Sequence, residues 1–180
     1  MVIVEGISDR IAVETLATRM GRDLAAEAVQ VVAIGGAHAL GSFLSGLGSS
    51  RFEVRLAGLC DMAEEEIFRR ALERAGFGAH VSRTDMERLG FYVCERDLED
   101  ELIRSLGAGA VETILAAQGD LGSFRTFQKE PAWRGQAAEA QLRRFMGSAD
   151  SRKIRYARLL TEALDLRRVP RPLAGVLGRV

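Results

Sequence analysis

Four short, largely apolar segments constrain the fold of this chain more than any other feature. They span residues 1–4, 29–34, 53–60 and 89–94. Between them, apolar side chains recur at the spacing of a helix that buries one face. Strands that alternate with helices pair in parallel through right-handed crossovers. We therefore expect an α/β fold, with a parallel sheet of about four strands flanked by helices.

The helices of this part have recognisable beginnings and ends. The first is predicted to start at Ser8, as its N-cap, and to stop before Gly21. Further helices are expected over residues 37–47, 64–74 and 97–106, each of which follows one of the predicted strands.

The remainder of the chain shows no strand pattern. We expect four or so helices there, with Pro131 near the first turn of one and with Pro170 and Pro172 ending another. The sequence thus predicts an α/β domain over residues 1–107 and an all-helical, basic extension over residues 108–180, packed on that domain.

Charge is unevenly distributed along the chain. Residues 1–120 contain 20 acidic and 12 basic residues, whereas residues 121–180 contain 5 acidic and 13 basic ones. An acidic part can hold a metal ion, and a basic part can hold a polyanion such as nucleic acid. Two oppositely charged parts that simply dock on each other would give the same pattern.

One uncharged segment, residues 28–50, is long enough to span a bilayer. It contains Gln30, His38 and five glycines, so a buried strand followed by a packed helix explains it better. Nothing resembles a signal peptide, and Cys60 and Cys94 lack metal-ligand spacing. We expect a cytoplasmic protein that does not associate with membranes.

Acidic residues follow three of the four predicted strands. They are Glu5 and Asp9 after the first, Asp61 and Glu64 after the third, and Asp97 and Glu99 after the fourth. The carboxyl ends of parallel strands meet at one edge of the sheet, where such folds bind ligands. Carboxylates gathered there repel one another, which indicates a hard divalent cation, Mg²⁺ or Mn²⁺, with one or two ions bound.

Most of these acids also have a structural interpretation. Asp9 can favour a helix dipole, Asp61 and Glu64 can form a capping box, and Asp97 can cap a helix. Glu5 is different, because a carboxylate that directly follows a fully apolar strand is costly to bury without a partner.

The order of these residues resembles the Toprim domain, and in particular the Toprim nuclease domain of OLD (overcoming lysogenization defect) family endonucleases. The resemblance rests on four positions: Val4-Glu5-Gly6-x-x-Asp9, Gly35-Gly36, Asp61, and Asp97-Leu98-Glu99. The helical part from Gln118 to Leu177 is also similar to the tail of OLD-like Toprim proteins.

The resemblance implies roles for individual residues. Glu5 corresponds to the metal ligand or general acid/base of the family, and Asp61 to the first residue of its Asp-x-Asp motif. Lys153, one of only two lysines, corresponds to a lysine near the scissile phosphate. Glu5, Asp61 and Lys153 are thus the expected catalytic residues. The expected metal ligands are Glu5, Asp9, Asp61, Glu64, Asp97 and Glu99.

The implied activity is metal-dependent hydrolysis of a phosphodiester bond in nucleic acid, with DNA as the expected substrate. Arginines of the extension are expected to hold the nucleic-acid backbone. They are Arg143, Arg144, Arg152, Arg155 and Arg158. The alternative for these arginines is a solvated helix face that pairs with the acidic part.

The chain departs from the family pattern at Ala63, where the motif has its second Asp. One metal site is weakened unless Glu64 or Glu65 takes over. The phosphate-binding loop of the family's ATPase is also missing from this sequence. Either an ATPase lies on a separate protein, or it belongs to a longer chain, or none is needed. A homodimer is also compatible with the sequence.

Three other functions compete with the nuclease. A non-catalytic Toprim module would bind metal or nucleic acid, or dock on a partner ATPase, and Ala63 supports it. A phosphoacceptor receiver domain would need a lysine after a fifth strand, but Lys153 lies in a helical region. A topoisomerase- or primase-like Toprim is the last alternative. A topoisomerase needs a nucleophilic tyrosine, and neither Tyr92 in a strand nor Tyr156 in a helix is an obvious candidate.

Overall fold

The computed structural model describes all 180 residues and confirms the predicted parallel sheet. Its strands are β1 (Val2–Val4), β2 (Val31–Ala33), β3 (Ala57–Asp61) and β4 (Phe91–Cys94). They lie in the order β2-β1-β3-β4, and every pair is parallel. All four carboxyl ends therefore point toward one edge of the sheet.

All four strands are shorter than the predicted segments, most clearly β2 and β3. Residues 53–55 are exposed and have no strand beside them, so β3 begins only at Ala57. The N–H of Val29 bonds to the carbonyl of Leu24 at 2.7 Å, which places Val29 in a turn before β2. A strand predicted from its apolar pattern can therefore be too long, because the pattern continues where no neighbouring strand is available for hydrogen bonding.

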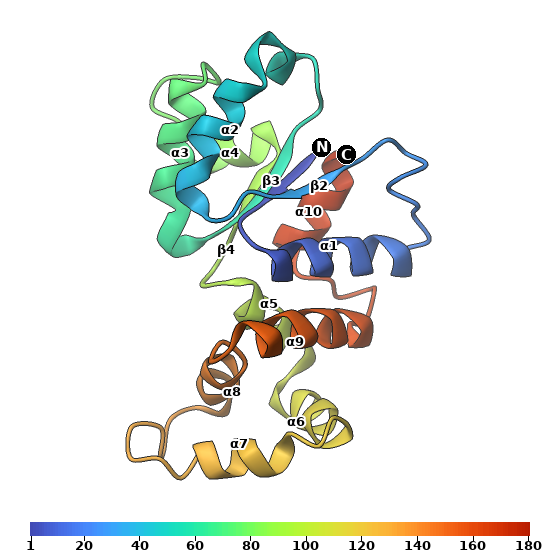
Figure 1. The fold of residues 1–180 in the computed structure, drawn as a ribbon, viewed down its shortest axis with the longest axis vertical. Coiled ribbons are helices and arrows are strands. Elements are labelled where there is room, and N and C mark those ends of the chain that lie inside the picture. Colours follow the sequence, from blue (N-terminus) through green and yellow to red (C-terminus); the bar gives the residue numbers. More distant parts are fainter.

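Helices cover both faces of the sheet (Figure 1). One face carries α2 (Leu40–Gly46), α3 (Glu65–Arg74) and α4 (Arg83–Leu89), whereas α1 (Ile7–Arg19) and α10 (Arg171–Arg179) cover the other. Side chains of a strand alternate between the faces. Ile3 and Cys60 accordingly belong to one core, and Val2, Val4 and Leu59 belong to the other.

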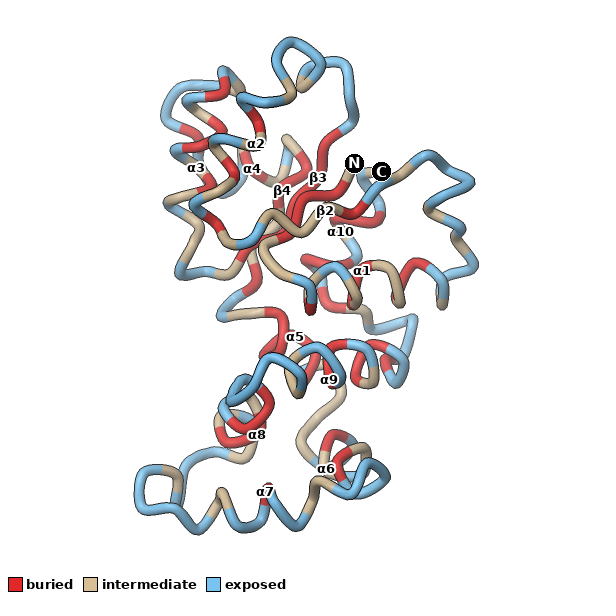
Figure 2. The backbone as a smooth tube through the Cα atoms, in the orientation of Figure 1, coloured by how far each residue is buried: buried red, intermediate tan, exposed pale blue.

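Five further helices form a lobe beyond the carboxyl ends of the strands (Figure 1). They are α5 (Leu98–Leu106), α6 (Ala108–Ala117), α7 (Leu121–Phe127), α8 (Ala138–Met146) and α9 (Asp150–Ala163). We call residues 98–163 the helical lobe. Helix α9 packs along α1, and the chain then returns to the sheet as α10. One core cluster joins buried residues of the strands with those of α5, α8 and α9, and Figure 2 shows buried stretches in each of these helices.

Several predicted helix ends are wrong. The N-cap of α1 is Gly6, while Ser8 lies buried in the first turn. Pro131 lies in a turn outside any helix. Pro170 is the N-cap of α10 and Pro172 lies in its first turn, so these prolines begin a helix. Proline fits the first helical turn because its missing N–H would have no partner there.

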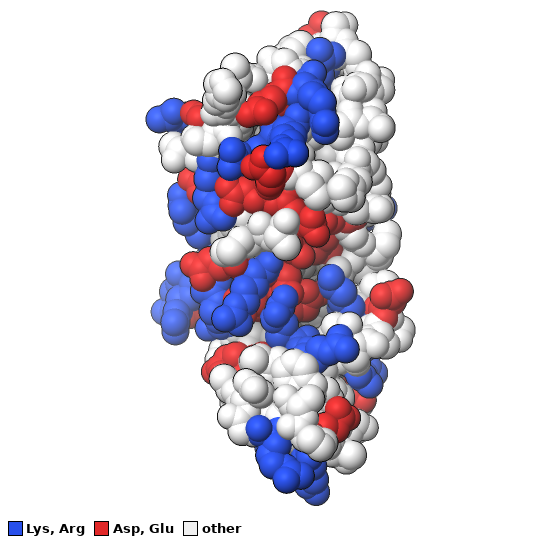
Figure 3. Space-filling model, turned by 90° about the vertical axis from the view of Figure 1, so that its left-hand side faces the viewer, with Lys and Arg blue, Asp and Glu red and all other residues white.

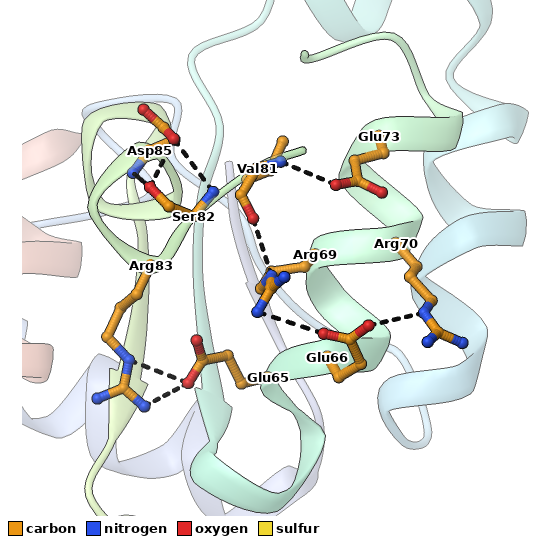
Figure 4. A network of polar contacts seen from close by, with 9 residues as sticks. All are labelled: Glu65, Glu66, Arg69, Arg70, Glu73, Val81, Ser82, Arg83 and Asp85. Carbon is orange, nitrogen blue, oxygen red and sulfur yellow. Dashed lines mark hydrogen bonds and ion pairs between the residues drawn. The ribbon is translucent and has the colours of Figure 1, made fainter. Parts of the chain in front are cut away.

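Helix α4 was not predicted, because seven residues are too few for a clear apolar period. Its sequence signal is a capping box, in which Ser82 and Asp85 bond each other's backbone N–H. Figure 4 shows this pair beside α3. There Arg69 of α3 donates to the carbonyl of Val81, and Glu73 of α3 accepts the N–H of Val81.

No helix of the molecule has both the length and the apolar character needed to cross a membrane. Within residues 28–50, the chain forms β2 and then the short helix α2, as expected.

Candidate metal centre

Glu5 joins three chain segments at the carboxyl edge of the sheet. Its Oε1 accepts the N–H of Asp61 at 3.1 Å, and its carbonyl accepts the N–H groups of Gly35 and Gly36 at 3.0 Å each. Both glycines have positive φ, +79° and +112°, which lets the turn after β2 close around Glu5. Burial raises the pKa of Glu5, and the negative charges of Asp9 and Glu64 add to that rise.

Asp61, the last residue of β3, is the most perturbed carboxyl of the edge. Burial raises its pKa to about 8, and the charges of Asp9, Glu5 and Asp97 act in the same direction. The expected capping box with Glu64 is absent, since the N-cap of α3 is Glu64 and no side chain caps that helix. Asp61 therefore has no capping role that would explain its position.

Asp9 reaches the same edge from the first turn of α1. Its Oδ2 accepts the N–H of Gly6 at 2.8 Å, so it does stabilise the helix start as the structural interpretation required. Burial nevertheless raises its pKa, and only the Gly6 N–H and the charge of Lys153 oppose that rise appreciably. Stabilising the helix and binding a cation are compatible roles for this residue.

Glu99 lies in the first turn of α5 and is only 4% exposed. Its Oε1 is buried and accepts no hydrogen bond, and the nearest cation is the Nζ of Lys153 at 3.6 Å. Burial raises its pKa to about 7; Lys153 opposes this, while Asp97 and Asp9 reinforce it. A buried carboxylate oxygen without a donor is rare in folded proteins and often marks a missing ion or water.

Lys153 supplies a positive charge to this edge from α9. Burial is the largest single influence and lowers its pKa, but the charges of Glu99, Asp9, Asp61 and Asp97 together raise it. The sequence separates Lys153 from the strand ends by more than fifty residues, and the packing of α9 beside α1 and α5 brings it to them.

Asp97 is committed to structural contacts. It is the N-cap of α5, where its Oδ1 accepts the N–H of Asp100 at 2.8 Å, and its Oδ2 lies 2.5 Å from Nε of Arg143. Glu64 ends the short helix that follows β3, and Ala63 beside it is exposed. These two acids have less support as ligands than the others.

The acids converge on one edge, but no three acidic, histidine or cysteine side chains are close enough to hold an ion as they stand. The donor set nevertheless fits a hard divalent cation. All of its donors are carboxylate oxygens, one of them is buried without a partner, and burial raises the pKa of four of the acids. Rotation of the long Glu side chains toward a bound cation would give the buried oxygen a partner and would lower the raised pKa values of these acids.

The arginines predicted to hold nucleic acid are dispersed. Arg143 is at the carboxylate edge, paired with Asp97. Arg144 and Arg152 line a hollow on the helical lobe. Arg155 pairs with Asp120, and Arg158 with Glu162 at 2.7 Å. The structure thus brings only Arg143 to the acidic edge.

Two buried acids near the site were not predicted. Asp100 and Glu101 are 5% and 7% exposed, and Arg104 pairs with both, at 2.8 and 2.9 Å. Glu101 also accepts the N–H of Glu95 at 2.9 Å, so this group fixes the turn between β4 and α5. The only sequence signal is the acidic run over residues 97–101, which periodicity alone does not separate into inward and outward positions.

Glu65, considered as a substitute for the missing Asp, points elsewhere. It pairs with Arg83 of α4, while Glu66 pairs with Arg69 and Arg70 (Figure 4). On the molecular surface, acidic side chains form a band between basic groups, at the height where the sheet meets the helical lobe (Figure 3).

Comparison with known proteins gives a consistent result. Residues 1–62 match the family model described as the TOPRIM domain of overcoming lysogenization defect protein-like proteins. No curated protein sequence matches the chain.

Solved structures extend the likeness to nearly the whole chain. The C-terminal region of the Xanthomonas campestris pv. campestris OLD protein aligns with a TM-score of 0.73 at 21% identity, covering 99% of this chain and 90% of that one. The C-terminal region of the Burkholderia pseudomallei OLD protein gives a TM-score of 0.72 at 16% identity, covering 99% and 94%. Residues 1–62 are thus similar in sequence to the OLD-like TOPRIM domain, and the chain shares its fold, over almost its full length, with the C-terminal regions of these OLD proteins.

Proposed function

We propose that this protein hydrolyses phosphodiester bonds of nucleic acid with the help of a divalent cation. The observation that carries the proposal is the convergence of Asp9, Asp61 and Glu99 around Lys153 at the carboxyl edge of a Toprim sheet, with Glu5 beside Asp9 and Asp61. These residues come from the turn after β1 and from α1, β3, α5 and α9, so only the folded chain assembles them.

Glu5, Asp9 and Glu99 would hold one ion, and Asp61 with Asp97 or Glu64 would hold a second. When bound, such a cation lowers the pKa of a coordinated water and offsets negative charge on the phosphate. The chain contributes orientation, because the N–H of Asp61 fixes the Glu5 carboxylate and the N–H of Gly6 fixes that of Asp9.

Lys153 would stabilise the negative charge that develops on the phosphate during the reaction. The surrounding carboxylates keep its amino group protonated, which suits this role. Arg143, which pairs with Asp97 at the same edge, would contact the nucleic-acid backbone and position it without reading sequence. The proposal includes DNA as substrate, Mg²⁺ or Mn²⁺ as the cation, an ATPase partner and a cytoplasmic setting.

A plasmid-nicking assay tests the proposal. Supercoiled plasmid is incubated with the protein and Mg²⁺ or Mn²⁺, and Glu5→Gln and Asp61→Asn are compared with wild type. We expect wild type to nick the plasmid and both variants to lose about 100-fold or more in rate. Glu27→Gln, which alters an exposed carboxyl far from the edge, is the matched control. Absence of nicking by wild type with either metal would refute the nuclease.

The two lysines provide a second matched pair. Lys153→Met removes the charge at the site and keeps most of the side-chain volume, whereas Lys129→Met does the same at an exposed position. We expect Lys153→Met to slow nicking by about 100-fold, the effect of removing one positioned electrostatic group, and Lys129→Met to retain metal-dependent nicking. Equal losses in both variants would contradict the role of Lys153.

A non-catalytic Toprim module is the second candidate. Ala63 replaces an expected ligand, and the acids do not form a closed group of three. This function predicts that calorimetry detects Mn²⁺ binding that Glu5→Gln abolishes, while no plasmid is nicked. The nicking assay and the calorimetric titration together separate the two functions.

A further inference from the structure

A hollow of ≈ 520 Å³ on the helical lobe combines aromatic and basic side chains. It lies between α7, the turns after it and the α8–α9 junction. Its wall includes Phe127, Trp133, Phe145, Arg144 and Arg152. None of the four carboxylates of the candidate metal centre lines it.

The aromatic wall is held rigidly. The rings of Phe127 and Trp133 are stacked, with centroids 5.3 Å apart and planes at 30°, and both are half-buried. Phe145, 4% exposed, supports Phe127 from behind with its centroid 5.8 Å away. The buried Gln141 donates from Nε2 to the carbonyl of Trp133 at 2.7 Å, which fixes the turn that carries the indole. The hollow therefore presents a preformed flat surface with its outer ring partly open to solvent.

The basic side chains here lack acidic partners, unlike most arginines of the molecule. Arg144 is exposed and forms no ion pair. The guanidinium of Arg152 lies 4.1 Å from the ring centre of Phe145 and donates to the Phe145 carbonyl and the Ser148 hydroxyl. By contrast, Arg143, which precedes Arg144 on α8, is paired with the carboxylate of Asp97. Among the lining residues, Glu130 alone is acidic, so this wall favours an anion.

The hollow adjoins the candidate metal centre. Helices α8 and α9 each carry two consecutive basic residues that divide between the two sites. Arg143 and Lys153 pair with carboxylates at the edge of the sheet, whereas Arg144 and Arg152 line the hollow. Successive residues of a helix point about 100° apart, so the two sites lie on neighbouring sides of the same pair of helices. A single polyanionic strand can contact both.

We propose that this hollow binds an unpaired base of single-stranded nucleic acid. The base would stack on Trp133 and Phe127, and Arg144 and Arg152 would hold the phosphates on either side of it. Stacking on aromatic rings inside a positively charged groove is the general way in which proteins bind single strands without reading sequence. A duplex keeps its bases stacked on one another and cannot insert one without unpairing it. The inference deepens the proposed function by naming its substrate class, and its link to cleavage rests on that function.

Trp133 is the only tryptophan of the chain, so its fluorescence reports directly on this hollow. The full-length protein is titrated in EDTA with thymidine or uridine oligonucleotides of about ten nucleotides, the size that such grooves accommodate. We expect saturable quenching by both single strands and little by a duplex or by inorganic polyphosphate, which has charge but no bases. No quenching by the single strands, or equal quenching by polyphosphate, would overturn the inference.

Variants separate stacking from charge, with binding followed by the anisotropy of a labelled oligonucleotide. We expect Trp133→Ala to weaken binding about ten-fold or more and Trp133→Phe to preserve most of it. Arg144→Ala should reduce the salt dependence of binding by about one ion. Arg55→Ala, at an exposed arginine before β3, should bind as wild type does. If Trp133→Ala bound the oligonucleotide with wild-type affinity, the proposal would be refuted. This outcome does not depend on whether Trp133→Phe folds.

Because binding is measured without metal, this test is independent of catalysis. Quenching without plasmid nicking would refute the proposed nuclease activity and support the single-strand site. Nicking without quenching would refute the single-strand site and support the nuclease activity.

Discussion

At the scale of single residues, the site is defined by carboxylates that the fold keeps close together and poorly solvated. Asp61 and Glu99 have pKa values of about 8 and about 7, far above the usual range for carboxyl groups. Burial is the main cause for both, so each acid favours either a proton or a cation beside it. This competition gives a measurable dependence on pH.

The metal-free protein should lose stability as pH rises from about 4 to about 9, between the unfolded and folded titrations of Asp61. The folded pKa of Asp61, about 8, lies above its unfolded value, so the folded state retains a proton that the unfolded chain has released. That stabilisation is complete below the unfolded pKa and is lost as pH rises through the folded one. A divalent cation requires the ionised carboxylate, so the rise in Tm caused by Mn²⁺ should be larger at pH 8.5 than at pH 6.

Thermal melts in EDTA and in Mn²⁺ across this pH range measure the effect. Asp61→Asn cannot ionise, so its metal-free Tm should fall less steeply than that of wild type. A wild-type Tm that increases with pH in EDTA, with Asp61→Asn following the same curve, would show that these carboxylates are not coupled as described.

At the scale of elements, the close approach of α10 to the sheet depends on a small residue. A Cβ at Gly175 would overlap the ring of Tyr92 on β4, whereas a Cβ at Gly178 on the same helix would meet no atom within 4 Å. The close approach lets α10 pack against β3 and β4 and bury its own side chains Leu173 and Val176 completely.

Gly175→Ala should therefore destabilise the protein by about 1–3 kcal/mol, because the added methyl group overpacks this contact. Gly178→Ala is the matched control and should be neutral or stabilising by up to about 1 kcal/mol, since alanine favours a helix. Urea unfolding followed by circular dichroism measures both. A stabilising Gly175→Ala would mean that α10 does not pack against Tyr92 in solution.

At the scale of the whole molecule, the two halves of the site must be held together. Helix α1 carries Asp9 and contacts α9, which carries Lys153. Arg19 of α1 donates from Nη1 to the carbonyls of Thr161 and Leu164, at 2.8 Å each, at the end of α9. These charge-assisted bonds fix α9 relative to the sheet.

Arg19→Ala should lower the free energy of unfolding by about 2 kcal/mol, because it removes bonds from a charged donor. Arg10→Ala, on the same helix, breaks only the exposed pair with Glu14 and should change stability by less than about 0.5 kcal/mol. Chemical unfolding measures both values, and plasmid nicking should fall more in Arg19→Ala. Equal stability of the two variants would show that the α1–α9 contact does not depend on Arg19.

Different parts of the protein were predictable to different degrees. The strands could be identified because their apolar runs are local, and the strand-end acids followed because parallel carboxyl ends share an edge. Helix α4 is short and its apolar period is weak, so its capping residues were the only signal. Sequence also could not separate the arginines, since Arg143 and Arg144 are neighbours in the chain and face different sites.

The α/β class, the parallel sheet and the acids at its carboxyl edge can be predicted from local sequence patterns, because hydrophobic periodicity and strand direction are properties of contiguous residues. Which acids are buried and which cations lie beside them depends on how the helices pack. Glu99 has an unbonded oxygen beside Lys153, and Asp97 is engaged by Arg143, because α8 and α9 pack across α5. Burial and charge proximity depend on residues distant in the chain, so only the packed molecule determines them.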